Sequence, residues 1–266
     1  MHFLFADETN TSPKHDERVK FFVYGGLIVP QESASDLDRK VTELRKKYGY
    51  AESDSLKFDT NCRPAHVSKS DFAAIKNEIV DLCLETNCKL LVYVVLHDIA
   101  RATGLAKTIK WGADHIFQKF NDFLIAEKSE GFAFVDRWSD TSEYNLLSEK
   151  FTKGLIYPTK VVPLEKIRLY AASCDNASHF GSVADIVLGS FRYCINQPLN
   201  QTAAKVMMKK IARLFWGDKV GDSYYVFERG LTFRPVQNKI AVDAYREEYS
   251  QLLTHMNSLL KKDTTK

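Results

Sequence analysis

The sequence predicts a mixed α/β fold in which helices cover both faces of a sheet. Two observations lead to this class. Apolar runs of strand length alternate along the chain with longer segments in which apolar residues recur at helical spacing, the pattern of strands interleaved with helices. In addition, the run KLLVYVVL at residues 89–96 is apolar almost throughout, as expected for a strand that is covered on both faces.

The composition is that of an ordinary globular protein. Hydrophobic residues make up 45% of the 266 residues, enough for one large core, or for one core with a modest second subdomain. We expect a main domain over residues 1–199 and an extension over residues 200–266 that packs on the same core. The formal net charge of +3 is too small to indicate a nucleic-acid-binding protein by itself, so any basic surface would have to be local.

The cysteines, histidines and apolar runs exclude several classes. The five cysteines form no C-x-x-C pair and the seven histidines show no H-x₃-H or H-E-x-x-H spacing, so we expect no structural zinc site. No signal peptide precedes the first predicted strand, which together with the odd number of cysteines suggests a reducing, cytoplasmic location. The longest apolar run, at residues 90–96, is far shorter than the about 18 residues that a membrane helix needs, so we expect no membrane partner.

The first predicted strand ends in two acids. In FLFADE, at residues 3–8, alternation places Phe5 and Asp7 on one face and Ala6 and Glu8 on the other. Asp7 and Glu8 therefore cannot both point into one site from a regular strand.

The next elements follow from apolar periodicity. Apolar runs predict strands at residues 21–30, 89–96, 131–136 and 166–173. Apolar residues at helical spacing predict helices at residues 36–48, 72–82, 109–124, 143–151 and 178–196, the second of them capped by Ser68 or Ser70. Between the first two helices lies a long loop without periodicity. The C-terminal part holds a predicted helix at residues 203–216, a strand at 224–227, a turn around Gly230 and a final helix.

The strand at residues 131–136 repeats the arrangement of the first one. In FAFVD, the side chains of Phe132, Phe134 and Asp136 share one face, so this strand also ends in an acid. Ligands of α/β proteins bind outside the carboxyl ends of the strands. If the two strands are parallel neighbours, Asp7 and Asp136 lie side by side in that crevice.

A third acid, Asp185, lies in the apolar helix SVADIVLGSF. Burial of a lone carboxylate is costly, so this side chain should have a partner. At helical spacing its neighbours are small or polar, and Gly189 is expected to leave open space beside it. This is the pattern of a helix face that borders a site.

The three acids have a structural and a functional interpretation. Asp7 and Asp136 could cap turns, and Asp185 could pair with Arg192 or with a lysine elsewhere, since structural ion pairs are common. A cluster of all three would be repulsive, by about 4 kcal/mol for each pair about 4 Å apart at an effective dielectric constant near 20. Such a cluster is tolerated when a cation neutralises it, and hard divalent cations prefer oxygen ligands.

These motifs resemble the domain of unknown function 3800 family. The resemblance rests on the first strand ending in ADETN, the following GGLIV strand, the strand-final VD, and S-x-x-x-S-x-A-D-I-V-x-G in a late helix. It covers about residues 1 to 195. Two departures stand out: Thr9-Asn10 replaces the usual Ser-Gly, and Ser182-Val183 replaces Gln followed by a hydrophobic residue.

The resemblance implies a ribonuclease H-like fold with a nuclease-like acidic site. Many proteins of this family occur near mobile elements or phage-defence genes. Asp7, Glu8, Asp136 and Asp185 stand in the matching positions. The family often has a lysine or histidine where this chain has Lys57, which would contact a phosphate or the transition-state charge. A solvated loop lysine is an equally good interpretation of Lys57.

Two serines and a basic segment complete the candidates. Ser178 and Ser182 would hydrogen-bond an acid that holds a metal, although Ser182 could equally bond its own helix backbone. Residues 205–239 carry eight Lys and Arg against three Asp and Glu, interleaved with aromatic residues. This composition suits a groove that holds a nucleic acid strand, or a core that buries the aromatic rings.

We therefore expect a Mg²⁺- or Mn²⁺-dependent nuclease that hydrolyses phosphodiesters of RNA or DNA. Asp7, Asp136 and Asp185 would hold one or two metal ions about 3.5–4 Å apart, with Glu8 as a ligand or a positioning residue. Besides nucleic acid, a second copy of the chain or an operon partner is expected to bind. One alternative is a non-catalytic nucleic-acid-binding or regulatory protein that retains the fold. Another is a receiver-like phosphoryl-transfer domain, but the chain is too long for that.

Overall fold

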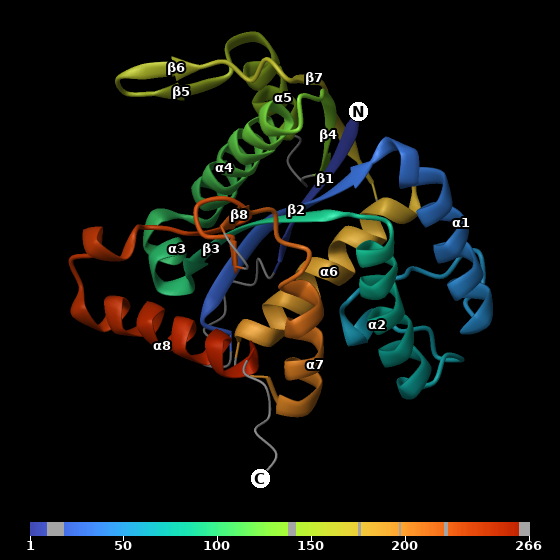
Figure 1. Cartoon of the computed structure of the whole chain (residues 1–266). Helices are drawn as coiled ribbons and strands as arrows, with labels where there is room; N and C mark the ends of the chain where they lie inside the picture. The colour runs from blue at the N-terminus through green and yellow to red at the C-terminus, as the bar shows by residue number, and fades with distance from the viewer. Residues whose placement is uncertain (10–18, 138–141, 175–176, 197, 221–222, 261–266) are drawn as a thin grey trace.

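The computed structural model describes residues 1–9, 19–137, 142–174, 177–196, 198–220 and 223–260, so Asn10 of the ADETN motif lies outside the described residues. Its centre is a six-stranded sheet in the order β10-β3-β2-β1-β4-β7 (Figure 1). The strands of this sheet are β1 (His2–Thr9), β2 (Phe21–Pro30), β3 (Lys89–Leu96), β4 (Gly131–Asp136), β7 (Ile167–Ser173) and β10 (Leu231–Phe233).

The strands run in both directions. β2 is antiparallel to its neighbours β1 and β3, whereas β4 is parallel to β1, β7 is parallel to β4, and β10 is parallel to β3. This confirms the predicted class, a mixed α/β sheet with helices on its faces. The parallel pairing of β1 with β4, on which the predicted site depends, is also confirmed.

Eight α-helices are present in the described part of the chain. They are α1 (Gln31–Lys47), α2 (Lys69–Glu85), α3 (His97–Thr103), α4 (Leu105–Ala126), α5 (Ser142–Lys153), α6 (His179–Ile195), α7 (Gln201–Ile211) and α8 (Asp243–Leu260). The smaller elements are the 3₁₀ turns η1 (Thr60–Cys62) and η2 (Gln237–Lys239), the hairpin of β5 (Leu155–Tyr157) and β6 (Lys160–Val162), and the pair β8 (Asp218–Val220) and β9 (Ser223–Tyr225).

The sheet divides the core into two layers. Phe5 of β1 faces the layer that contains α1, α2, α6, α7 and α8, whereas its neighbour Leu4 faces the layer that contains α4 and α5. The Phe5 ring stacks on Phe134 of β4, with centroids 5.1 Å apart, and on Phe180 of α6, at 5.0 Å. The alternation predicted for β1 and β4 therefore holds. It places Asp7 and Asp136 on the α6 side of the sheet.

Close packing of α6 on β2 depends on a glycine. A Cβ atom on Gly25 would lie 2.3 Å from Cδ2 of Leu188 in α6 and 2.8 Å from the carbonyl oxygen of Leu91 in β3. Only a residue without a side chain lets the helix approach this closely. This contact fixes α6, and with it Asp185, against the centre of the sheet.

The C-terminal part differs from the prediction. The helix predicted over residues 203–216 ends at Ile211, and the chain then turns so that the Leu214 carbonyl accepts the N–H of Leu90 on β3, at 2.8 Å. The edge strand β10 was not predicted. Its three residues are too few to show alternation.

No helix of the described residues is both long and apolar enough to cross a bilayer.

Candidate active site

Asp7 and Asp136 are neighbours across the parallel β1–β4 pair. The register pairs Phe5 with Phe134 and Ala6 with Val135, and one residue further along both strands brings in the two aspartates. In each aspartate, Oδ1 accepts the backbone N–H of the following residue, from Glu8 at 2.8 Å and from Arg137 at 2.9 Å. Both carboxylates are thus held by the backbone near the carboxyl ends of their strands.

Asp185 is tied to the loop that precedes α2. Its Oδ2 accepts the backbone N–H of Phe58 at 2.6 Å, which is a short, charge-assisted hydrogen bond. The prediction of open space beside Gly189 is wrong, because the Phe58 side chain fills that space. A Cβ atom on Gly189 would lie 2.3 Å from the Phe58 Cγ. The glycine on this helix face serves the approach of the loop.

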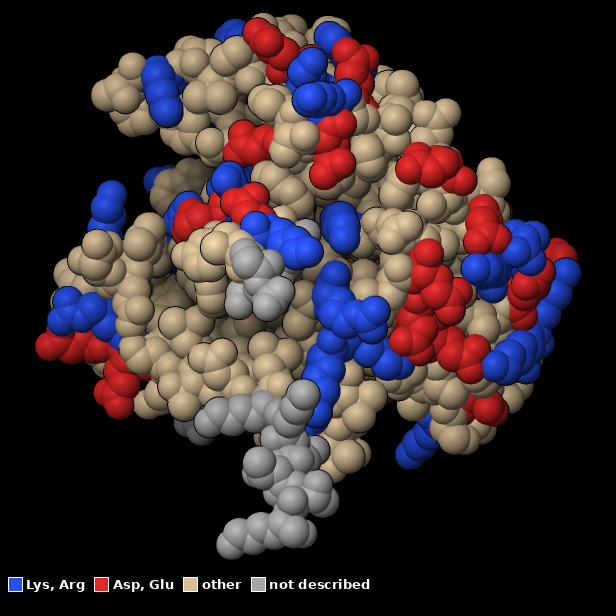
Figure 2. Space-filling model, viewed as in Figure 1, with Lys and Arg blue, Asp and Glu red and all other residues tan. Residues whose placement is uncertain are grey.

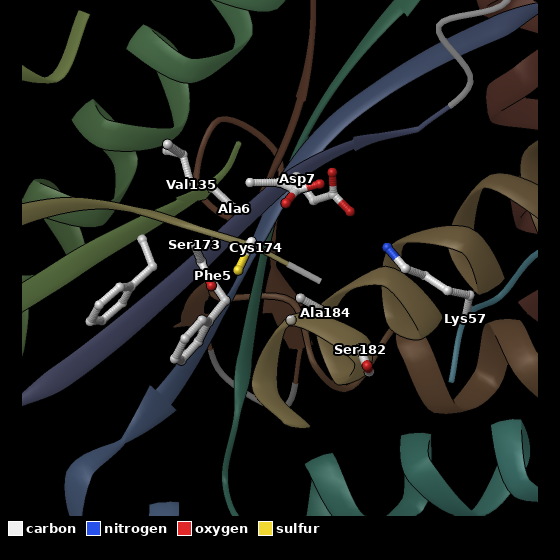
Figure 3. Close-up of a pocket in the computed structure, with 12 residues that line it drawn as sticks. Phe5, Ala6, Asp7, Lys57, Val135, Ser173, Cys174, Ser182 and Ala184 are labelled. Carbon is white, nitrogen blue, oxygen red and sulfur yellow. The ribbon is translucent and has the colours of Figure 1, made fainter. Parts of the chain in front are cut away.

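The contact of this loop with α6 places Lys57 close to the aspartates. It lines a small cleft together with Asp7, Asp136 and Ser182. Figure 3 shows its side chain reaching from the loop toward Asp7, with α6 below. The cleft has a volume of about 30 Å³, which is enough for one or two water molecules.

The acids interact strongly with one another. Burial raises the pKa of Asp7 well above its ordinary value, and the charges of Glu8, Asp136 and Asp185 raise it further, while Lys57 lowers it. Burial, followed by the charge of Asp136, raises the pKa of Glu8 to about 7. The ends of β1 and β4 therefore concentrate negative charge in a poorly hydrated place, which is a common property of functional sites.

Glu8 lies apart from the cleft. It pairs across the sheet with Tyr24, whose side chain belongs to the core layer on the α4 side. Among the described residues its buried Oε2 atom has no hydrogen-bond partner. The structure thus brings Asp7, Asp136, Ser182 and Lys57 to one cleft and leaves Glu8 behind the strand, as alternation requires.

The donors fit a hard divalent cation in their chemistry. Asp7 and Asp136 offer carboxylate oxygens in the cleft, and the raised pKa of Asp7 is a feature that a cation would relieve. Over the ranges that the structure describes, however, no three His, Cys, Asp or Glu side chains are gathered in an arrangement that could hold a metal ion.

Two residues that were not predicted line the cleft, whereas the predicted Ser178 is not among its lining residues. Ser178 occupies the N-cap position of α6, where its side chain makes no capping hydrogen bond. Ser173 and Cys174, at the end of β7, line the cleft and were not predicted. Asp136 pairs directly with Ser173, so the rule that found the aspartates, that parallel strands end at one edge, could have found these two as well.

Comparisons with known proteins leave the family open. No protein-family model and no curated protein matches the sequence. Among solved structures, the chain is similar to one in the structure of the PCNA:RNase HII complex from Archaeoglobus fulgidus, with a TM-score of 0.39 and 14% identity over 72% of this chain and 73% of that chain. A likeness of this size carries no conclusion on function, and membership of the domain of unknown function 3800 family stays a prediction.

Proposed function

We propose that this protein is a divalent-cation-dependent phosphodiester hydrolase that acts on nucleic acid. One observation carries the proposal: Asp7 and Asp136 lie side by side near the carboxyl ends of adjacent parallel strands, in a small cleft that Lys57 also lines. Closely spaced carboxylates beside one lysine are a suitable environment for a Mg²⁺ or Mn²⁺ ion and the phosphate that it binds.

Each side chain has a definite task in this proposal. Asp7 and Asp136 would hold the cation, with Asp185 and Glu8 close enough to add to the negative potential. When bound, the cation supplies Lewis-acid polarisation of a phosphoryl oxygen and lowers the pKa of a bound water. Lys57 would offset the charge that develops on the phosphate oxygens. Asp185 orients the loop that carries Lys57, through its hydrogen bond with the Phe58 N–H.

The size of the cleft favours a polymer over a small metabolite. Pockets that enclose small-molecule ligands usually measure about 300–1,000 Å³. A cleft of about 30 Å³ has room for an ion and its water, so the phosphate must approach from outside. A nucleic acid strand lying across the mouth of the cleft satisfies this requirement.

A second candidate is a nucleic-acid-binding protein without activity. The observation in its favour is that no metal-holding group of three side chains is gathered among the residues of known placement. In that case the buried acids would stay partly protonated at neutral pH, with Glu8 titrating at a pKa of about 7.

Cleavage of labelled strands tests the proposal. Single- and double-stranded RNA and DNA are incubated with the native protein, with Asp136→Asn and with Asp36→Asn, in Mg²⁺, in Mn²⁺ and in EDTA. Asp36 is an exposed acid of α1 that pairs with Arg39, so its variant is the matched control. We expect cation-dependent cutting that Asp136→Asn slows by about 10²- to 10³-fold and Asp36→Asn leaves unchanged.

Thermal unfolding in the same salts separates the two candidates. A cation that binds only the folded state raises stability by mass action. Millimolar Mn²⁺ should raise the melting temperature of the native protein and of Asp36→Asn more than that of Asp136→Asn. Equal shifts for all three proteins, without cutting of any strand, would favour the non-catalytic candidate.

A further inference from the structure

A second cavity lies on the other side of the loop that carries Lys57. It has a volume of about 430 Å³ and is enclosed by α2, α6, the start of α7 and residues 58–60. Figure 1 shows these three helices side by side on one face of the sheet. None of the sequence motifs assigned a role to this place.

Two cations with restricted hydration line this cavity. Lys76 of α2 lies over the rings of Phe58 and Phe72, at 4.5 and 3.9 Å from their centroids, and donates to the Phe58 carbonyl at 3.3 Å. Burial lowers the pKa of Lys76 to about 8 and lowers the pKa of Arg192 as well, although Asp185 and Asp59 oppose both shifts. Poorly hydrated cations are stabilised by an anion that enters the cavity.

A buried hydroxyl also lines the cavity. Ser190 of α6 is 1% exposed, and its Oγ has no hydrogen-bond partner among the described atoms. Buried hydroxyls are nearly always satisfied, so an unpartnered one at the wall of a cavity points to a ligand oxygen or a bound water. Asp59, the one acid among the lining residues, is exposed and already accepts the Asn61 N–H at 2.9 Å.

The cavity and the acidic cleft share one wall. Lys57 lines the cleft and Phe58 lines the cavity, and the Phe58 N–H is the donor that holds Asp185. Arg192 follows Asp185 by seven residues on α6, which corresponds to about 10 Å along the helix. A nucleic acid strand that lies across the acids and continues along α6 would reach this cavity.

The surface beside the cavity is basic. α7, which contributes Ala203 and Met207 to the wall, also carries Lys205, Lys209 and Lys210. In Figure 2 blue side chains form a strip over α7, whereas red and blue side chains are mixed over α1. The potential beside α7 favours an approaching polyanion.

We propose that this cavity binds a phosphate group of a nucleic acid strand, held by Lys76, Arg192 and the Ser190 hydroxyl, next to the phosphodiester at the acidic cleft. This inference rests on the proposed function, because that function supplies the strand. A strand held at two places presents a defined phosphodiester to Asp7 and Asp136.

Binding of a nucleic acid strand in the absence of metal tests the inference. Affinity for a labelled single-stranded octanucleotide is measured in EDTA at several salt concentrations, for the native protein, Lys76→Met, Lys76→Arg, Arg192→Met and the control Lys107→Met. Lys107 is an exposed lysine of α4, on the opposite face of the sheet. Loss of one phosphate contact should weaken binding about tenfold and reduce the slope of log affinity against log salt by about 0.7.

We expect that loss for Lys76→Met and Arg192→Met, near-native binding for Lys76→Arg, and no change for Lys107→Met. Each variant is first checked for cooperative thermal unfolding. If Lys76→Met does not unfold cooperatively, the inference is tested by the binding of Arg192→Met alone. Native binding by both Met variants would overturn the inference, as would an equal loss for Lys107→Met. A nucleoside monophosphate or inorganic phosphate that competes as tightly as the octanucleotide would show a small-molecule site instead.

The two proposals fail separately. If the native protein cuts a strand and both Lys76→Met and Arg192→Met still bind normally, the phosphate site is wrong and the proposed function stands. If no strand is cut but Lys76→Met weakens binding about tenfold, the proposed hydrolase is wrong and the phosphate site stands.

Discussion

Gly189 sets how closely the loop that carries Lys57 approaches α6. The Phe58 ring occupies the space where a side chain on residue 189 would lie, with 2.3 Å between the Phe58 Cγ and a Cβ on that residue. The same contact brings the Phe58 N–H onto Asp185. One missing side chain on the helix therefore supports two of the site residues, Asp185 and Lys57.

A methyl group at this position should displace the loop. We expect Gly189→Ala to destabilise the protein by about 1–3 kcal/mol, because the ring of Phe58 cannot move without giving up its packing. Gly181→Ala, in the first turn of the same helix, is the matched control, since nothing lies within 4 Å of a Cβ there. Urea unfolding measures both variants. Equal stability of the two would show that the loop yields without cost.

His97 should make the stability depend on pH. It is buried against Phe22, and burial, helped by the charge of Arg101, lowers its pKa to about 4. Between pH 6.5 and 4 the unfolded chain binds a proton at this residue that the folded chain does not, so stability falls as the pH is lowered through this range.

The expected loss from His97 alone is about 3 kcal/mol between pH 7 and pH 4. His97→Phe keeps the ring and removes the titration. The free energy of unfolding is measured by urea at both pH values, and the fall should be smaller in the variant by about that amount. The same fall in both proteins would show that His97 titrates normally in the folded state.

Two helices that bear on the site begin in different ways. In α2, the Ser68 Oγ accepts the Asp71 N–H at 3.0 Å, as one of the two predicted caps. In α6, Ser178 occupies the same N-cap position but makes no capping bond. At the start of α2, a side chain therefore accepts one of the N–H groups that have no partner within the helix. At the start of α6, Ser178 provides no such acceptor.

Alanine at these two positions should have unequal effects. We expect Ser68→Ala to lower the free energy of unfolding by about 1 kcal/mol, the usual contribution of a capping serine. Ser178→Ala should lower it clearly less. Thermal unfolding of the two variants measures the difference. A larger loss for Ser178→Ala would mean that its hydroxyl has another structural partner, such as the one predicted for it at the acids.

Apolar periodicity predicted the long helices and strands. The rule that parallel strands end at the same edge of a sheet predicted that Asp7 and Asp136 are neighbours. β1 and β4 each show alternation over several residues, so the face of Asp7 and Asp136 could be deduced without a structure. Strand β10 was not predicted, because its three residues are too few to show alternation. Lys57 could be proposed only from the family resemblance, because its loop has no period and the Phe58–Gly189 contact joins residues that are distant in sequence.

The C-terminal residues are built into the same core as the sheet. Met208 of α7 and Leu252 of α8 belong to the layer that also holds Phe5 and Val92. β10 covers the outer edge of β3, and the Gly230 carbonyl accepts the Val92 N–H at 2.7 Å. The described residues between 200 and 260 thus cover both a face and an edge of the sheet.

Removal of this part tests the predicted boundary at residue 199. A chain of residues 1–199 would leave the β3 edge unpaired and the apolar face under α7 and α8 exposed, and both features favour aggregation. We expect this fragment to be insoluble or to melt without cooperativity, while the full chain melts in one transition. Circular dichroism on heating and size-exclusion chromatography compare the two. A soluble fragment with a sharp transition of its own would instead support an independent domain that ends near residue 199, with α7, α8 and β10 added to it.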